Sequence, residues 1–229
     1  MSRRPLRVAS LPAVLLACAL LVACGDSDEQ SAGTPTPEPP SPAQAAGCEQ
    51  VEAPAPKEDA ELAKPDARLQ RGKAYVATVA TSCGEFEITL DSRRAPLTGG
   101  SFRYLAGKGF YDGLTFHRIV SGFVIQGGDP AGDGGGGPGY SVVEAPPAGL
   151  AYTKGVVAMA KTQTERPGTS GSQFFVVTAE DAQLPPDYAL LGKVTKGQDV
   201  VDRIGVLPTT ADEQPAEPVV IRSVEVAQG

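Results

Sequence analysis

The sequence is poor in residue types on which many binding and catalytic sites depend. Among its 229 residues it has no tryptophan, one histidine and only 6% aromatic residues. Without tryptophan, the core must rely on aliphatic side chains and on seven phenylalanines. A single histidine excludes a cluster of imidazole ligands, and no Cys or His cluster has the spacing of metal ligands. We therefore expect no metal site.

The lone histidine, His117, also argues against a serine hydrolase. His117 would have to be the base, but the segment Gly168–Ser172 breaks the Gly-x-Ser-x-Gly pattern at its last position. The glycine-rich segment Gly132–Gly139 resembles neither a phosphate loop followed by Lys-Ser or Lys-Thr nor a complete calcium loop. We interpret His117 as a packed residue and expect no cofactor.

The N-terminus has the pattern of an export signal. Three arginines in residues 3–7 precede an apolar run over Leu11–Val22, which is too short for a membrane-spanning helix. The run ends in Leu21-Val22-Ala23-Cys24, which resembles the lipobox of bacterial lipoproteins and implies that Cys24 is lipidated. An ordinary secretory signal with an incidental cysteine is the alternative. The flanking residues favour the Sec route over twin-arginine export.

The chain is acidic, with a formal net charge of −7. Removal of residues 1–23 takes away three arginines and no acidic residue, so the mature charge becomes −10. Nucleic acid and anionic lipid surfaces are therefore not expected as partners. We expect membrane attachment through the lipid, which anchors stably when two or more acyl chains are present.

Two of the four cysteines remain for other roles, because Cys18 leaves with the signal and Cys24 would carry the lipid. In an exported protein, Cys48 and Cys83 are candidates for a disulfide that ties the end of a linker to the first hairpin. Two free thiols are the alternative.

Composition divides the chain into three parts. Residues 1–23 are the signal, residues 24–71 a linker rich in Pro, Ala and Ser, and residues 72–229 the folded domain. We expect residues 25–47 to form a disordered tether. A short helix is expected near residues 59–63.

The folded part reads as mainly β, with a sandwich or a barrel as the candidate architectures. A hairpin is indicated where Phe86, Ile88 and Leu90 alternate with polar residues after Tyr75–Ala80. Helices are expected over residues 97–106 and 199–204. Further strands are expected over residues 115–120, 123–126, 156–160, 173–178, 190–194 and 219–226.

Arg118 is the residue most suggestive of function. On a regular strand over Thr115–Val120 it shares a face with Phe116 and Val120, and an arginine among large apolar residues is costly unless it binds something. A structural pairing with a carboxylate such as Glu87 or Asp129 is the alternative.

Four segments together resemble the cyclophilin family, in order and in spacing, over residues 73–226. They are Tyr111–Ile119 (YDGLTFHRI), Gly122–Asp129 (GFVIQGGD), Met159-Ala160 and Gly171–Phe175 (GSQFF). The resemblance implies a closed eight-stranded antiparallel barrel capped by two helices, with a peptide groove on its outer surface. It also implies peptidyl-prolyl cis-trans isomerase activity without cofactor, metal or nucleotide.

By this resemblance the site falls into two sets. The catalytic residues are Arg118, Phe123, Gln126 and Phe175. The substrate-binding residues are His117, Val124, Ala160, Lys161, Thr162, Gln173, Leu184 and Tyr188.

Three positions depart from the family pattern. Gln183 stands at the usual groove tryptophan, Tyr188 at the second histidine, and Lys161 at the asparagine after Met-Ala. Loss of the tryptophan removes a large rigid contact and an indole donor. We therefore expect weak binding of cyclosporin A with isomerase activity retained.

The expected protein is a monomeric isomerase acting on proline-containing polypeptides at the extracytoplasmic face of a bacterial membrane. The main alternative is a binding module or holdase that uses the same groove without turnover. The presence of both Arg118 and the apolar pocket residues favours the enzyme.

Overall fold

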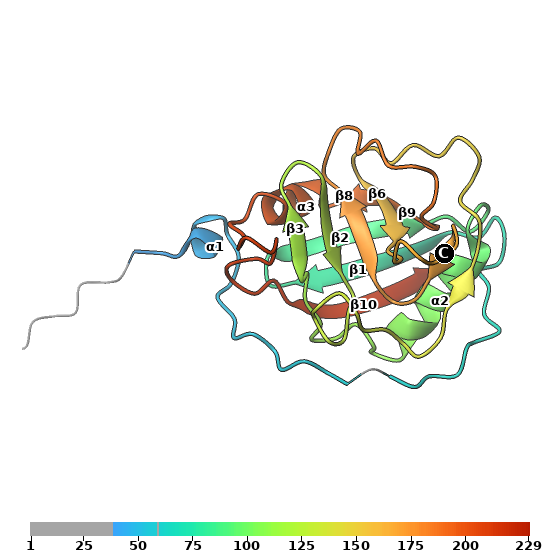
Figure 1. Cartoon of the computed structure of the whole chain (residues 1–229), viewed down its shortest axis with the longest axis horizontal. Coiled ribbons are helices and arrows are strands. Elements are labelled where there is room, and N and C mark those ends of the chain that lie inside the picture. The colour runs from blue at the N-terminus through green and yellow to red at the C-terminus, as the bar shows by residue number, and fades with distance from the viewer. Residues whose placement is uncertain (1–38, 59) are drawn as a thin grey trace, which may run out of the picture. The chain divides into compact units, whose positions relative to one another are not determined.

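The computed structural model describes residues 39–58 and 60–229 (Figure 1). The expected signal and the expected lipid site at Cys24 lie outside the described residues. Residues from Pro39 to Gly229 form one compact unit. No helix within the described ranges is long and apolar enough to cross a membrane.

One antiparallel sheet of eight strands dominates this unit, in the order β10-β1-β2-β9-β6-β8-β4-β3. Its strands are β1 (Tyr75–Thr81), β2 (Gly84–Leu90), β3 (Arg118–Val120), β4 (Val124–Gly127), β6 (Val156–Met159), β8 (Phe174–Val177), β9 (Leu190–Lys196) and β10 (Ile221–Gln228). A second, two-stranded sheet pairs β5 (Val142–Val143) with β7 (Thr169–Ser170). The sequence did not indicate this small sheet, because two-residue strands carry no periodic pattern.

The expected eight strands are therefore confirmed, but the ladder does not close fully. The edge strands β10 and β3 are not neighbours in the sheet, and the two edges meet through a single bridge between Thr115 and Val220. Hydrogen bonds from Phe116 N to Val219 O (2.9 Å) and from Ile221 N to Leu114 O (2.7 Å) flank this bridge. The sheet is thus curled and joined at one point rather than closed by a continuous ladder.

The same irregular segment corrects the expected orientation of Arg118. Regular strand structure begins only at Arg118. Before it, Thr115 forms isolated bridges both to Asp129, beyond the end of β4, and to Val220, ahead of β10. Phe116 and Ile119 are both buried in the main core, whereas Arg118 and Val120 are half-buried. Arg118 therefore lies on the outer face, opposite to Phe116.

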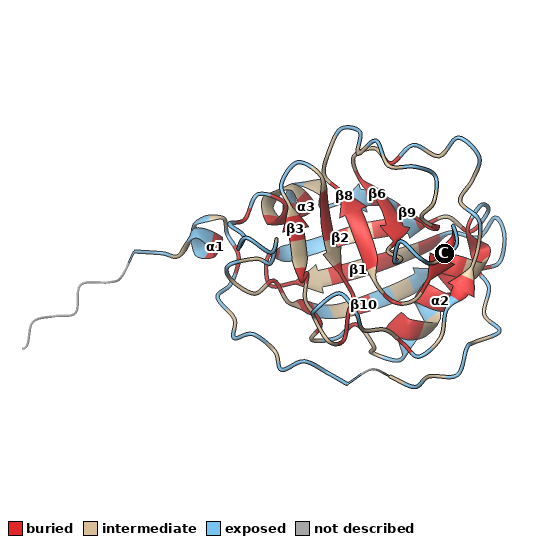
Figure 2. Cartoon of the chain, viewed as in Figure 1, coloured by how far each residue is buried: buried red, intermediate tan, exposed pale blue. Residues whose placement is uncertain are grey.

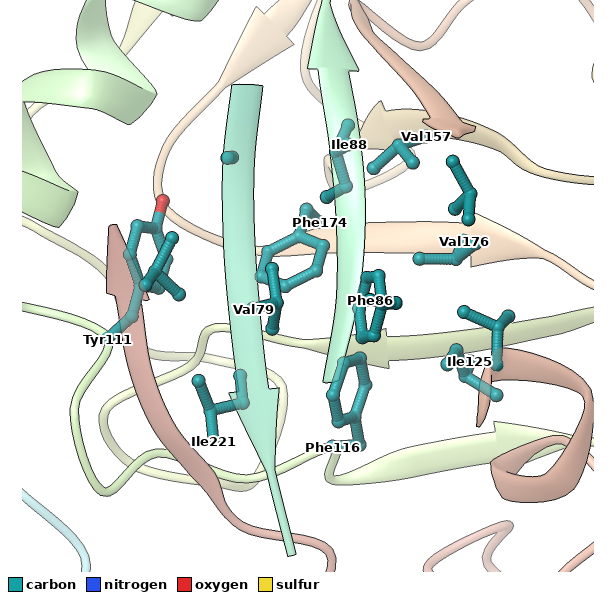
Figure 3. Packing of buried hydrophobic residues seen from close by; sticks show 14 of the residues in the cluster. Val79, Phe86, Ile88, Tyr111, Phe116, Ile125, Val157, Phe174, Val176 and Ile221 are labelled. Carbon is teal, nitrogen blue, oxygen red and sulfur yellow. The ribbon is translucent and has the colours of Figure 1, made fainter. Parts of the chain in front are cut away.

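The main core is formed mostly by residues of the sheet strands and of α2, where buried residues are frequent (Figure 2). Figure 3 shows Phe174 of β8 at its centre, near Phe116, Phe86 and Tyr111. The ring of Phe174 meets those of Phe116 and Tyr111 edge to face, with centroids 5.9 Å apart in both cases. Edge-to-face contacts stabilise aromatic pairs beyond the area that they bury, so several smaller rings can stabilise a core without tryptophan.

Two helices cover the sheet, α2 (Pro96–Gly107) and α3 (Gln198–Ile204), close to where the sequence predicted them. The N-terminus of α2 has no capping side chain of its own. Glu144 supplies one instead, accepting hydrogen bonds from the main-chain N–H groups of Leu97 (3.1 Å) and Thr98 (2.7 Å). A carboxylate at this position also complements the helix dipole.

The described part of the expected linker is docked on the domain. It includes a short helix α1 (Pro42–Ala45), where disorder was expected, with Ser41 and Gln44 forming a capping box. Cys48 and Cys83 are joined by a disulfide. The helix expected near residues 59–63 is not formed over 60–63.

We call residues 39–58 and 60–71 the strap. Main-chain hydrogen bonds that hold it along the domain include Glu49 N to Ser82 O (2.7 Å), Lys57 N to Pro130 O (2.8 Å), Leu62 N to Pro138 O (3.0 Å) and Leu69 N to Pro96 O (2.9 Å). The Cys48–Cys83 disulfide also ties the strap to the domain, across a sequence separation of 35 residues. A disulfide that encloses a loop of this size contributes about 3 to 4 kcal/mol to the free energy of unfolding.

Candidate functional site

Arg118 belongs to a row of side chains that crosses four strands. Register places it directly opposite Gln126 of β4, Gln126 opposite Phe175 of β8, and Phe175 opposite Ala158 of β6. Residues directly opposite each other share a face of the sheet. Three of the four predicted catalytic residues therefore stand side by side, with Arg118 about 10 Å from Phe175.

Apolar side chains surround Phe175 on this outer face and form a second cluster, separate from the main core. Val124, Val177 and Val156 make the neighbouring row of the same sheet face. The cluster includes the predicted pocket residues Phe123, Val124, Ala160, Phe175, Leu184 and Tyr188. Such a surface, next to a cationic donor, suits an apolar ring attached to a polar peptide.

Three aromatic rings support the wall of this cluster. The rings of Phe175 and Tyr188 meet edge to face at 5.4 Å, and Tyr152 lies behind both, at 6.2 Å from Phe175 and 6.0 Å from Tyr188. The Tyr152 hydroxyl donates to the carbonyl of Tyr188 (2.6 Å) and accepts from its main-chain N–H (3.0 Å). Burial raises the pKa of Tyr152 to about 12, so its hydroxyl stays protonated.

A cavity of about 470 Å³ continues the site beyond Gln126. Its lining includes the predicted groove residues Gln126, Ala160, Lys161, Thr162 and Gln173. The Gln126 amide donates to Gln173 Oε1 (3.0 Å), and Gln173 Nε2 donates to the carbonyls of Gly134 (2.9 Å) and Gly136 (3.0 Å). This relay fixes the glycine-rich loop against the groove.

Lys161 and Thr162 form the rim of the groove. The Lys161 ammonium lies 5.5 Å from the centroid of the Tyr188 ring and donates to the carbonyls of Thr162 and Glu165, both at 3.2 Å. The Glu165 carboxylate accepts from the Thr162 main-chain N–H (2.7 Å) and hydroxyl (3.0 Å). Gln183, at the expected tryptophan position, is exposed and has a left-handed backbone with φ of 52°.

His117 is the one predicted groove residue that the structure places elsewhere. It lines a different cavity, together with Phe116, Asp129 and strap residues Ala53–Pro56. The side chain is buried, and neither ring nitrogen makes a well-formed hydrogen bond within the described part of the chain. Burial lowers the pKa of His117, an effect that the nearby Asp129 carboxylate partly offsets.

Arg118 pairs with a carboxylate that the sequence did not point to. Its Nε donates to Glu213 Oε2 at 2.6 Å. The two acids considered from sequence have other partners. Glu87 pairs with Lys196, and Asp129 accepts from the main-chain N–H groups of its own loop.

Tyr152 and Glu213 are the site residues that sequence reasoning missed. Neither belongs to a motif, and each reaches the site only because distant segments meet. For Tyr152 the available signal was its large apolar ring between Ala151 and Thr153. For Glu213 no local signal existed, since it lies in a polar loop between α3 and β10.

The arrangement can bind an apolar ring, hold an extended peptide and donate hydrogen bonds from a cation. Within residues 39–58 and 60–229, no group of three His, Cys, Asp or Glu side chains could hold a metal ion.

Comparison with known proteins identifies relatives of this domain. A sequence profile described as "Cyclophilin type peptidyl-prolyl cis-trans isomerase/CLD" matches residues 76–226. A probable peptidyl-prolyl cis-trans isomerase A of Mycobacterium leprae is 37% identical over 169 residues, covering 66% of this chain and 91% of that protein. A peptidyl-prolyl cis-trans isomerase B of Streptomyces anulatus is 40% identical, with 66% and 95% covered.

Solved structures of cyclophilin-type isomerases also resemble this chain in fold. The crystal structure of a Cryptosporidium parvum cyclophilin type peptidyl-prolyl cis-trans isomerase superposes with a TM-score of 0.64 at 28% identity, covering 68% of this chain and 99% of that one. A crystal structure of the same parasite isomerase in the presence of the dipeptide Ala-Pro gives a TM-score of 0.63 at 28% identity, covering 67% and 99%.

Proposed function

Because this chain belongs to the cyclophilin family and is a peptidyl-prolyl cis-trans isomerase, we propose that Arg118 stabilises the twisted amide while the outer apolar cluster holds the proline ring. The observation that carries this proposal is the row formed by Arg118, Gln126 and Phe175. It combines a cationic donor, an amide and an apolar wall on one sheet face.

The reaction explains why these residue types suffice. Rotation about an X-Pro bond must overcome amide resonance, a barrier of about 18–20 kcal/mol, and the uncatalysed step takes tens to hundreds of seconds. No covalent bond breaks, so neither a nucleophile nor a general base is required. The site therefore does not need His117 as a proton acceptor.

Arg118 acts on the difference between the planar and twisted amides. When the amide twists, the prolyl nitrogen loses conjugation and regains a lone pair that can accept a hydrogen bond. A fixed guanidinium donor stabilises this state more than it stabilises the planar ground state. Phe175 and its apolar neighbours hold the ring while the carbonyl rotates.

The groove beside Gln126 receives the peptide on either side of the proline. Gln126 and Gln173 offer amide groups along the groove, and Ala160 offers main-chain groups. Client recognition thus rests on peptide backbone and on the proline ring, which suits a broad range of unfolded polypeptides.

The proposed clients are newly exported or surface proteins. The supporting features are the export signal and lipobox-like cysteine in the sequence, and the Cys48–Cys83 disulfide, since disulfides persist in oxidising compartments. Together they favour a lipid-anchored isomerase at the extracytoplasmic face of a bacterial membrane.

Isomerisation of a short Ala-Pro peptide by the full-length chain tests the role of Arg118. We expect Arg118→Ala to lower kcat/KM roughly 100-fold, the loss typical of one preorganised donor. Arg222→Ala, an exposed arginine on β10 paired with Glu49, serves as the matched control and should leave kcat/KM unchanged. Equal activity of Arg118→Ala and the unmodified chain would falsify the assignment.

A further inference from the structure

The ion pair between Arg118 and Glu213 joins the donor of the site to a loop that lies far from it in sequence. Glu213 lies in the segment between α3 and β10, and its Oε2 accepts from Arg118 Nε at 2.6 Å. Both side chains are only partly covered, with 35% of Arg118 and 45% of Glu213 exposed. The contact uses one of the five N–H groups of the guanidinium and leaves the four on the terminal nitrogens for other acceptors.

The backbone around Glu213 is held at several points. Its carbonyl accepts from the main-chain N–H of Ile119, the residue after Arg118, at 2.8 Å, and its own N–H donates to Thr210 O at 3.1 Å. The base of the loop is closed by Thr210 N to Gln214 O and Ala216 N to Pro208 O, both at 2.8 Å. The loop is thus fastened to β3 beside the arginine that its side chain contacts.

Glu213 also has a backbone conformation that side chains rarely adopt. Its φ of 62° lies in the left-handed region, and apart from Gln183 it is the only non-glycine residue there in the described ranges. Strained residues of this kind persist where surrounding contacts fix them, and they concentrate at functional sites. The hydrogen bonds to Ile119 and Thr210 supply that fixation.

We propose that Glu213 is a positioning residue for the isomerase reaction, holding the Arg118 guanidinium through Nε so that its terminal N–H groups are preorganised for the twisted amide. This inference rests on the proposed role of Arg118. A partly exposed arginine has many rotamers to lose on binding, and restricting them before substrate arrives removes that cost from the transition state.

A stabilising role for the ion pair does not account for this arrangement. Exposed ion pairs contribute little to the free energy of unfolding. A comparable pair, Lys196–Glu87 at 2.9 Å, spans β9 and β2 without any link to the row that contains Arg118. If Glu213 acts as a positioning residue, its removal should affect turnover far more than stability, whereas removal of Glu87 should affect neither.

The test is a set of variants in the full-length chain, with kcat and KM for an Ala-Pro peptide measured separately alongside thermal melting. We expect Glu213→Ala to lower kcat roughly tenfold, the loss of one charge-assisted hydrogen bond, with KM changed by less than about twofold. Glu213→Gln should retain most activity, because its amide oxygen still accepts from Nε. Glu87→Ala is the matched control and should match the unmodified chain.

A second variant at Glu213 distinguishes loss of the contact with Arg118 from disruption of the loop. Asparagine tolerates the left-handed backbone but is one methylene shorter, so Glu213→Asn should keep the fold and lose the contact. It should show the same loss of kcat as Glu213→Ala. In a chain that already carries Arg118→Ala, neither substitution should reduce activity further.

The outcomes separate this inference from the proposal beneath it. Unchanged or increased kcat in Glu213→Asn, with Arg118→Ala impaired, overturns the positioning role and leaves that of Arg118 intact. If Glu213→Asn lowers kcat by the same factor in the Arg118→Ala chain as in the unmodified chain, the substitution acts through the loop in general, and the positioning role is also overturned. Normal activity of Arg118→Ala overturns the proposed function itself.

Discussion

Arg118, Gln126 and Phe175 illustrate how single residues acquire a role from strand register. Each is half-buried or buried on the outer face, and the antiparallel ladders β3–β4 and β4–β8 set them opposite one another. A register slip of one residue in either ladder would turn the side chains of one strand to the inner face. The chemistry of the row thus depends on hydrogen bonds of the backbone.

His117 should make stability depend on pH. Its pKa is lowered in the folded state, chiefly by burial, so the unfolded chain binds a proton more readily. Stability from this group is therefore complete above its unfolded value of about 6.5 and is lost as pH falls toward the folded value. Urea midpoints measured between pH 8 and pH 5.5 should fall as the pH falls.

In the variant His117→Gln the urea midpoint should depend less on pH over the same range, because the side chain no longer titrates. Carboxylates titrate at lower pH and affect both chains alike. An unchanged slope in the variant would assign the dependence to other groups.

Gln183 governs the expected response to cyclosporin A. The resemblance to the cyclophilins implies a tryptophan at this position; glutamine lacks that large ring and indole donor, and the left-handed backbone here is one that tryptophan rarely adopts. We expect half-inhibition of the Ala-Pro isomerase assay only at micromolar inhibitor or above. Nanomolar inhibition of the unmodified chain would contradict this expectation.

At the scale of elements, the strap explains a feature of α2 that looks unfavourable in sequence. Gly99 and Gly100 weaken a helix, yet both lie within α2. A Cβ added at Gly100 would lie 2.4 Å from Ala67 O, and one at Gly99 would lie 2.4 Å from Leu69 Cδ1. The glycines let the strap approach the helix.

Alanine substitutions in α2 should therefore have opposite effects at two glycines. Gly107→Ala meets nothing within 4 Å and should raise the free energy of unfolding, by up to about 1 kcal/mol. Gly100→Ala should lower it despite a gain in helix propensity, because the new methyl group overlaps the strap backbone. Chemical denaturation of both variants measures the difference, and equal effects would argue against tight docking of the strap.

At the scale of the whole molecule, one compact unit from Pro39 to Gly229 carries both the strap and the sheet. The strap contacts the loop that contains Pro130 and Pro138, and the same loop is tied to Gln173 in the groove. The strap, which precedes the residues matched by the family profile, therefore contacts the loop that supports the peptide groove.

The location of the protein in the cell depends on the N-terminal part of the chain. If Cys24 carries the lipid, Cys24→Ala should move the protein from the membrane fraction to the soluble fraction of a bacterial host, with isomerase activity per molecule unchanged. The anchor requires the acylated cysteine, since one acyl chain binds only marginally and two bind stably. Retention of the variant in the membrane fraction would contradict lipid anchoring at this residue.

The class of fold and the main strands and helices follow from the sequence, whereas the roles of the site residues stay predictions. Alternating apolar residues indicate half-buried strands, and the spaced motifs include Phe123 and Phe175 of the outer apolar cluster and Gln126 and Gln173 of the groove cavity. These signals are local, because they depend on side-chain periodicity and on short runs of residues.

The remaining features depend on tertiary contacts. The burial pattern places Arg118 on the face opposite to Phe116, and its carboxylate partner is Glu213 rather than Glu87 or Asp129. His117 lines a different cavity, which strap residues Ala53–Pro56 also line. All of these features come from contacts between segments distant in sequence, which local pattern does not encode.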